Sequence, residues 1–216
     1  YIPVKPSIAK TIIKTSKQKW YRKPKSGDLN FPTFYNTSLK LDKAAKKVIR
    51  DSSIEIMNLL PDPSKSFDPV SGLVVGNVQS GKTANFTALV ARAADSGYNL
   101  IVILSGGNFN DLRAQTQLRM FKDLVDPVNA IKEVWHKATN ADNTLRGDVG
   151  NTKSGWNQNW NPKTHPHCLV VTKKNSSTLP NLKDWVLSIK STSEVPIKML
   201  LIDDEADHAS LNRLVS

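Results

Sequence analysis

A glycine-rich loop constrains this sequence more than any other feature. Residues 76–83 read Gly-Asn-Val-Gln-Ser-Gly-Lys-Thr and fit the pattern G-x-x-x-x-G-K-[ST]. An apolar triplet at residues 73–75 predicts a short buried strand before the loop, and the spacing of apolar side chains over 84–95 predicts a helix after it. Glycines let a backbone close around an anion while loop amides and the helix N-terminus point at it. The pattern therefore predicts a phosphate-binding turn between a strand and a helix.

The chemistry of such a loop assigns roles to single residues. We expect it to bind the phosphates of ATP, with Lys82 reaching the β- and γ-phosphates during catalysis and the Thr83 hydroxyl binding Mg²⁺. The expected nucleotide-binding residues are Gly76, Asn77, Val78, Gln79, Ser80, Gly81, Lys82 and Thr83.

Short apolar runs alternate with helical patterns after this loop. Residues 100–104, 168–172 and 199–202 read as buried strands, while 110–125 and 178–189 read as helices, with Leu112 and Leu118 facing inward. This alternation predicts an α/β fold with a mainly parallel sheet. Residues 126–167 interrupt it and predict a long irregular insertion, with one short helix near 128–135.

The last predicted strand ends in acidic residues about 120 positions after the glycine-rich loop. In nucleotide hydrolysis one carboxylate holds Mg²⁺ and a second polarises the attacking water. We expect Asp204 to bind the metal and Glu205 to act on the water, with Asp203 the weaker metal candidate.

Positive charge is concentrated at the N-terminal end. The net charge is +11, and residues 1–50 hold 13 Lys and Arg against 2 Asp and Glu, whereas residues 51–216 are balanced. Basic residues also surround Trp20 and Tyr21, which suits phosphate contact with base stacking. The alternative is a partly ordered extension in which Trp20 packs on the domain.

A helix is predicted over residues 39–60, capped by Thr37 or Ser38 and stopped by Pro61. Its apolar face is expected to include Leu41 and Val48. Four basic residues recur three or four positions apart and lie along one stripe: Lys40, Lys43, Lys47 and Arg50. This stripe is predicted either to face a nucleic-acid backbone or to form a solvated outer surface.

The single cysteine, Cys168, excludes an internal disulfide and fits a reducing, cytoplasmic setting. No run of residues is long and apolar enough for a membrane span, so we expect no membrane partner.

Four longer strings resemble one known group of proteins. Residues 76–83 and 204–208 resemble motifs I and II (Walker A and Walker B) of superfamily 2 helicases and translocases, and residues 112–117 resemble motif Ia. Within that superfamily the strings at 72–85, 110–117, 171–175 and 201–210 resemble the Z-one domain family, whose members carry an endonuclease label.

The resemblance implies an RecA-like P-loop lobe over residues 72–216, after a basic, partly irregular extension (1–37) and an amphipathic helix with a linker (38–71). It implies an ATP hydrolase that acts on nucleic acid, double-stranded DNA in our expectation, in restriction or antiviral defence. Motif Ia and the residues after the strand at 168–172 suggest further nucleic-acid contacts: Arg113, Gln115, Gln117, Lys173 and Lys174. Asp207 and His208 are expected to couple nucleotide state to the nucleic-acid path.

Other parts of such a motor are not matched in residues 1–216. Motif III, the second RecA lobe and its arginine finger are missing from the match, so hydrolysis by these residues alone is expected to be very slow. No Asp…Glu-x-Lys nuclease signature is visible. Two alternatives remain: an ATP-driven switch that gates an effector without moving along DNA, and a nucleic-acid-binding module whose ATP binding is incidental.

Overall fold

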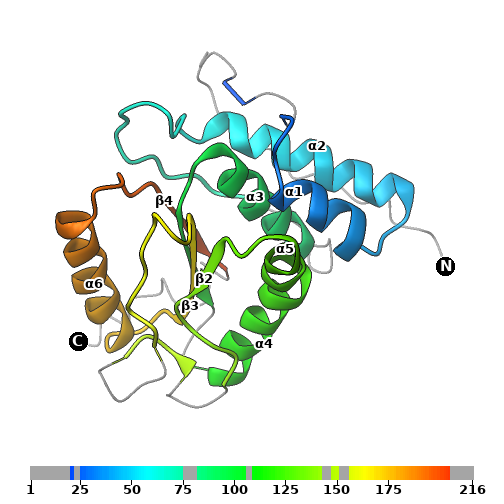
Figure 1. Cartoon of the computed structure of the whole chain (residues 1–216). Helices are drawn as coiled ribbons and strands as arrows, with labels where there is room; N and C mark the ends of the chain where they lie inside the picture. The colour runs from blue at the N-terminus through cyan, green and yellow to red at the C-terminus, as the bar shows by residue number, and fades with distance from the viewer. Residues whose placement is uncertain are drawn as a thin grey trace, which may run out of the picture. The chain divides into compact units, whose positions relative to one another are not determined.

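The computed structural model describes residues 20–21, 25–74, 82–105, 109–142, 147–150 and 156–204 (Figure 1). The chain divides into two units, residues 1–96 and 97–216, and each is described by itself. The first holds α1 (Asn30–Thr33), the π-helical turn η1 (Phe34–Ser38), α2 (Lys43–Leu59) and α3 (Lys82–Ser96). The second holds β1 (Leu100–Ser105), α4 (Asn110–Met120), the π-helical turn η2 (Phe121–Val125), α5 (Asp126–Ile131), β2 (Trp135–Lys137), β3 (His167–Lys173), α6 (Thr178–Thr192) and β4 (Met199–Asp203).

The sheet of the second unit is parallel throughout its described strands, in the order β2-β3-β1-β4. Leu100 pairs with Cys168 on one side of β1 and with Met199 on the other. Helices α4 and α6 lie on opposite sides of this sheet (Figure 1). The predicted α/β class with a mainly parallel sheet is therefore confirmed.

Alternation along the strands divides the core of this unit between the two faces of the sheet. Alternate residues of β1 and β3, such as Val102 and Val170, share a cluster with Trp185 and Ile189 of α6. Trp156, from the segment between β2 and β3, packs edge-on against Trp185, with ring centroids 5.5 Å apart. The insertion thus supplies core residues to the face that α6 covers.

The insertion is more regular than predicted. Trp135 begins β2, which pairs in parallel with β3, and α5 ends at Ile131, before the predicted end of its helix. The strand escaped detection because three residues are too few to show an alternating pattern. The Asn129 side chain links the two elements, since its Oδ1 accepts from the backbone N–H groups of Val134 (3.1 Å) and Trp135 (2.9 Å).

Helix α2 begins later than predicted, because a different residue caps it. The Asp42 carboxylate accepts a 2.8 Å bond from the Ala45 N–H, whereas the Thr37 hydroxyl donates to the Thr33 carbonyl inside η1. The predicted apolar face was wrong at Leu41 and Val48, which are exposed. The buried positions are Ile49, Ser53 and Met57, four residues apart.

Two side chains of α3 hold the N-terminal segment of the first unit. The Asp95 carboxylate accepts backbone bonds from Leu29, Asn30 and Phe31 at 2.8–3.1 Å and thereby caps α1. Arg92 is almost fully buried, and its guanidinium lies 3.4 Å from the ring centroid of Phe31. Burial lowers the pKa of Arg92, while bonds to Tyr21 and Ser53 satisfy it.

The residues just before the glycine-rich loop do not form the predicted strand. Leu73 and Val74 are 71% and 52% exposed and lie in irregular backbone, and Val75 falls outside the described residues. A short apolar run becomes a strand only when a neighbouring strand supplies ladder hydrogen bonds, and neither Leu73 nor Val74 pairs with a described strand. Among the described helices none is long and apolar enough to cross a membrane.

Candidate nucleotide site

The carboxyl ends of the parallel strands bring polar side chains to one edge of the sheet. Ser105 pairs with Lys173, and Leu104 pairs with Asp203. In open parallel α/β sheets this edge is where ligands bind. The structure thus places Asp203, and Asp204 directly after it, where the sequence predicted a metal site.

Asp203 is held in a defined orientation. Its Oδ2 accepts a 2.6 Å charged hydrogen bond from the Lys174 ammonium, and both side chains are largely buried. Its Oδ1 is buried and has no hydrogen-bond partner among the described residues. The Asp204 N–H donates to the Leu104 carbonyl at 2.9 Å, which fixes the backbone immediately after the strand.

This arrangement fits Mg²⁺ in its donor chemistry. Magnesium prefers oxygen ligands and usually keeps several waters, which need nearby acceptors. The Oδ1 of Asp203, which has no donor within the described ranges, is such an acceptor, and Asp204 follows it directly in the chain. Within the described ranges no three Asp, Glu, His or Cys side chains gather as a metal site.

Most of the predicted phosphate loop lies outside the described residues. Residues 75–81 belong there, as do Glu205, Asp207 and His208. The helix predicted after the loop is present as α3, which begins at Lys82 and continues through Thr83. The Thr83 carbonyl accepts a 2.7 Å bond from the Thr87 hydroxyl, as the first turn of a helix allows.

Three of the predicted nucleic-acid contacts are buried, and this corrects the prediction for them. Arg113 and Gln117 are fully buried, and Lys173 is 4% exposed. Each bonds within the second unit, so none presents its side chain to a nucleic acid. The prediction stays open for Gln115 and for the stripe of Lys40, Lys43, Lys47 and Arg50, all of which are exposed. Lys174 instead bonds to Asp203.

Arg113 instead fastens the segment after β2 to α4. Its Nη1 donates to the carbonyls of Asn140 (2.8 Å) and Gly147 (3.1 Å), and its Nη2 donates to the carbonyl of Asp142. Its Nε lies 3.9 Å from the buried carboxylate of Asp148. Burial lowers the pKa of Arg113, and the charge of Asp148 opposes that shift. A side chain on Gly147 would collide with the Asp142 carbonyl and the Arg113 guanidinium, so this position requires glycine.

The buried carboxylate of Asp148 links Arg113 of α4 to Thr172 and Lys173 at the end of β3. Its Oδ1 accepts from the Thr172 hydroxyl at 2.6 Å, and its Oδ2 lies 3.7 Å from the Lys173 ammonium. Lys173 also donates to Asn110 Oδ1 at 2.6 Å, at the start of α4. Asp148 could not be predicted from the sequence, because a lone acidic residue in a polar insertion resembles any solvated one.

Thr139 and Gln117 extend this network through hydrogen bonds between uncharged groups. The Thr139 hydroxyl donates to Gln117 Oε1 at 2.7 Å and accepts from the Val171 N–H at 2.8 Å. The polar face of α4 is therefore matched by partners from the insertion and from β3.

Trp20 packs within the first unit, as the alternative to base stacking predicted, and Tyr21 does the same. The Trp20 indole donates to the Leu60 carbonyl at 2.6 Å, and the Tyr21 N–H donates to Asn58 Oδ1 at 3.1 Å. The Tyr21 hydroxyl meets Arg92. Both rings are thus committed to contacts within the first unit, although each remains partly exposed.

Comparison with known proteins yields no relatives: no protein-family model, curated protein or solved structure matches the chain.

Proposed function

We propose that this chain is an ATP-binding, Mg²⁺-dependent hydrolase lobe of the P-loop type, acting on nucleic acid in a cytoplasmic restriction or defence setting. The observation that carries the proposal is the ordered acidic end of β4. Lys174 binds one oxygen of Asp203, and the other oxygen is buried with no donor from the part of the chain that the structure describes. Asp204 follows directly in the sequence. A glycine-rich phosphate loop in the sequence directly before α3 supports the same chemistry.

In this proposal the chain's own residues divide the work. Lys82 and the loop amides bind the phosphates, Thr83 and Asp204 hold the metal, and Glu205 orients or deprotonates the attacking water. When bound, Mg²⁺ would neutralise charge on the transferred phosphoryl group. The bond between Lys174 and Asp203 fixes the end of β4 directly before Asp204 and Glu205.

Calorimetry with ATP and Mg²⁺ tests the binding step. Lys82→Ala removes a charged contact worth about 1.5–3 kcal/mol, which weakens binding roughly 10- to 150-fold. Lys47→Ala, on the exposed face of α2, is the matched control and should leave binding unchanged. Equal affinities for wild type and Lys82→Ala would exclude the phosphate-loop assignment.

Glu205→Gln separates binding from chemistry. It should keep ATP affinity and abolish phosphate release, including release stimulated by a second lobe or partner chain that supplies an arginine. Turnover unchanged by Glu205→Gln would remove that residue from the reaction.

One observation favours an ATP-driven switch as a second candidate. Arg113, Gln117 and Lys173 are all buried, which takes three expected contacts away from a nucleic-acid track. Phosphate release stimulated by double-stranded DNA supports the motor, and release that ignores DNA supports the switch.

A further inference from the structure

Helix α4 is inverted relative to an ordinary surface helix. Its inward positions include Arg113 and Gln117, both fully buried, whereas Leu112 and Leu118 are 38% and 55% exposed. The predicted inward orientation of Leu112 and Leu118 is therefore wrong, because the inward face is taken by hydrogen bonds to the insertion. The helix thus turns its arginine away from any ligand outside this unit.

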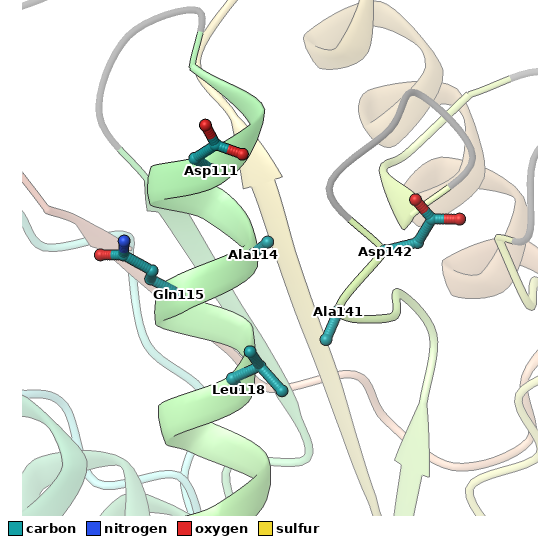
Figure 2. Close-up of a pocket in the computed structure, with 6 residues that line it drawn as sticks. All are labelled: Asp111, Ala114, Gln115, Leu118, Ala141 and Asp142. Carbon is teal, nitrogen blue, oxygen red and sulfur yellow. The ribbon is translucent and has the colours of Figure 1, made fainter.

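Gln115 is the exposed residue of α4 that was predicted as a nucleic-acid contact. Figure 2 shows its side chain pointing away from the segment after β2, which holds Ala141 and Asp142. A glutamine amide can donate a hydrogen bond to a phosphate but cannot neutralise its charge. Among the charged contacts predicted in the second unit, Lys174 is the one whose side chain is still partly exposed, at 20%.

Lys174 reaches across the carboxyl end of the sheet. It directly follows β3, whereas Asp203, which accepts its hydrogen bond, is the last residue of β4. Because β1 lies between these strands and neighbouring strands are about 5 Å apart, β3 and β4 are roughly 10 Å apart. The two side chains therefore meet at the end of β1, on the edge where open parallel sheets bind ligands.

The turn between β3 and α6 fixes the backbone around Lys174. The Asn175 Oδ1 accepts from the N–H groups of Ser177 (3.1 Å) and Thr178 (2.9 Å), and the Thr178 hydroxyl donates to the Lys173 carbonyl at 2.6 Å. A change of partner by Lys174 therefore requires only a rotation of its side chain.

The ammonium group of Lys174 has unused donors. A lysine has three, and among the described residues Lys174 bonds only to Asp203, at 2.6 Å. The two side chains are 20% and 29% exposed, so solvent reaches the pair, and partly solvated ion pairs are weaker than buried ones. A phosphate oxygen is an anionic acceptor like the carboxylate and can compete with it for the ammonium group.

We propose that Lys174 is a coupling residue that exchanges between Asp203 and a backbone phosphate of bound nucleic acid. Without nucleic acid, Asp203 holds the ammonium group. When a phosphate takes it, the carboxylate that directly precedes Asp204 and Glu205 loses its partner, so nucleic-acid binding changes the acidic end of β4. Because linkage is reciprocal, any change that separates Asp203 from Lys174 also strengthens nucleic-acid binding. The inference rests on the nucleic-acid part of the proposed function and does not require ATP hydrolysis.

Fluorescence anisotropy of a short labelled DNA duplex, titrated with the full chain at several salt concentrations and without nucleotide, tests the exchange. Asp203→Asn should tighten binding about two- to fivefold, because the ion pair no longer has to break. Lys174→Met should lower the slope of log affinity against log salt by about 0.9, the loss of one phosphate contact. In the Lys174→Met background, Asp203→Asn should give no tightening.

Helix α6 provides matched controls, because Lys183 and Asp184 are exposed. Lys183→Met and Asp184→Asn make the same charge changes and should leave affinity and slope unchanged. Urea unfolding checks that each variant is folded, and if Asp203→Asn is not, the slope of Lys174→Met decides.

Three results overturn the proposal. One is an unchanged slope in Lys174→Met while the wild type binds duplex, which leaves the proposed function intact. The second is equal tightening by Asp203→Asn with and without Lys174, which would be a general effect of charge. The third is a wild-type chain that does not bind duplex at all, which also removes nucleic acid from the proposed function but not ATP, because calorimetry measures ATP binding separately.

Discussion

Replacing Arg113 by methionine tests whether this side chain is a buried structural residue, as in the structure, or a nucleic-acid contact, as the resemblance to motif Ia implied. Methionine keeps much of the length of the side chain but removes its donors and its charge. Three backbone carbonyls then lose the donor that the buried Arg113 supplied, and the Asp148 carboxylate loses one of its two nearby cations. A nucleic-acid contact at the surface would instead contribute almost nothing to folding.

The magnitude follows from burial. Charged hydrogen bonds are worth about 1.5–3 kcal/mol each but are not additive. Removing one partner of a buried ion pair costs about 3–5 kcal/mol, and we expect Arg113→Met to lower the free energy of unfolding by that amount. Domains typically have about 5–15 kcal/mol in total, so the variant should lose a substantial share of its stability.

Urea unfolding followed by tryptophan fluorescence and circular dichroism measures this loss. Arg119→Met makes the same change at an exposed position of α4 and should shift stability by less than about 0.5 kcal/mol. Arg113→Lys should be intermediate, because one ammonium cannot reach three carbonyls in the way a guanidinium does. A loss below about 1 kcal/mol for Arg113→Met, together with weaker DNA binding, would refute the buried network and restore the surface contact.

Two further predictions concern pH and salt. Burial lowers the pKa of His167 to about 4, so as the pH falls the unfolded chain takes up this proton before the folded chain does. The contribution of His167 to the free energy of unfolding is therefore fully present above its ordinary pKa near 6.5. It declines toward pH 4 by up to about 3 kcal/mol. His167→Phe should flatten that slope in urea titrations, and an unchanged slope would exclude His167 as its source. Replacing Lys43, Lys47 and Arg50 together by glutamine should lower the salt dependence of DNA binding if this exposed stripe meets phosphates. If the salt dependence is unchanged, the stripe is a solvated face. Deleting residues 1–37 is not an equivalent test, because the deletion removes Phe31 and Phe34, which are buried.

Elements with a strong local pattern could be predicted from the sequence. The strands β1, β3 and β4 and the helices α3, α4 and α6 lie close to their predicted ranges. Their apolar runs carry the information themselves, and alternation of strand and helix implies a parallel sheet.

Features that depend on distant partners could not be predicted. The phase of α4 was wrong, because Arg113 is drawn inward by carbonyls about 30 residues later, at Asn140 and Gly147. The start of α1 is set by Asp95, 65 residues further on. At the candidate site the sequence indicated Asp204 as a metal ligand. Lys174 was predicted as a nucleic-acid contact, and its bond to Asp203 emerged only from the fold.

The contacts of Asp95 and Arg92 in α3 with the N-terminal segment determine when that segment can fold during synthesis. Residues 29–31 find their cap only when Asp95 has been made, 65 residues after Asn30. At about 5–20 residues per second this wait lasts roughly 3–13 s on the ribosome. Until then Phe31 and Phe34 lack the burial they have in the finished protein, and loop closure over that separation has yet to occur. The nascent N-terminal segment therefore remains available to chaperones until the last turn of α3 emerges.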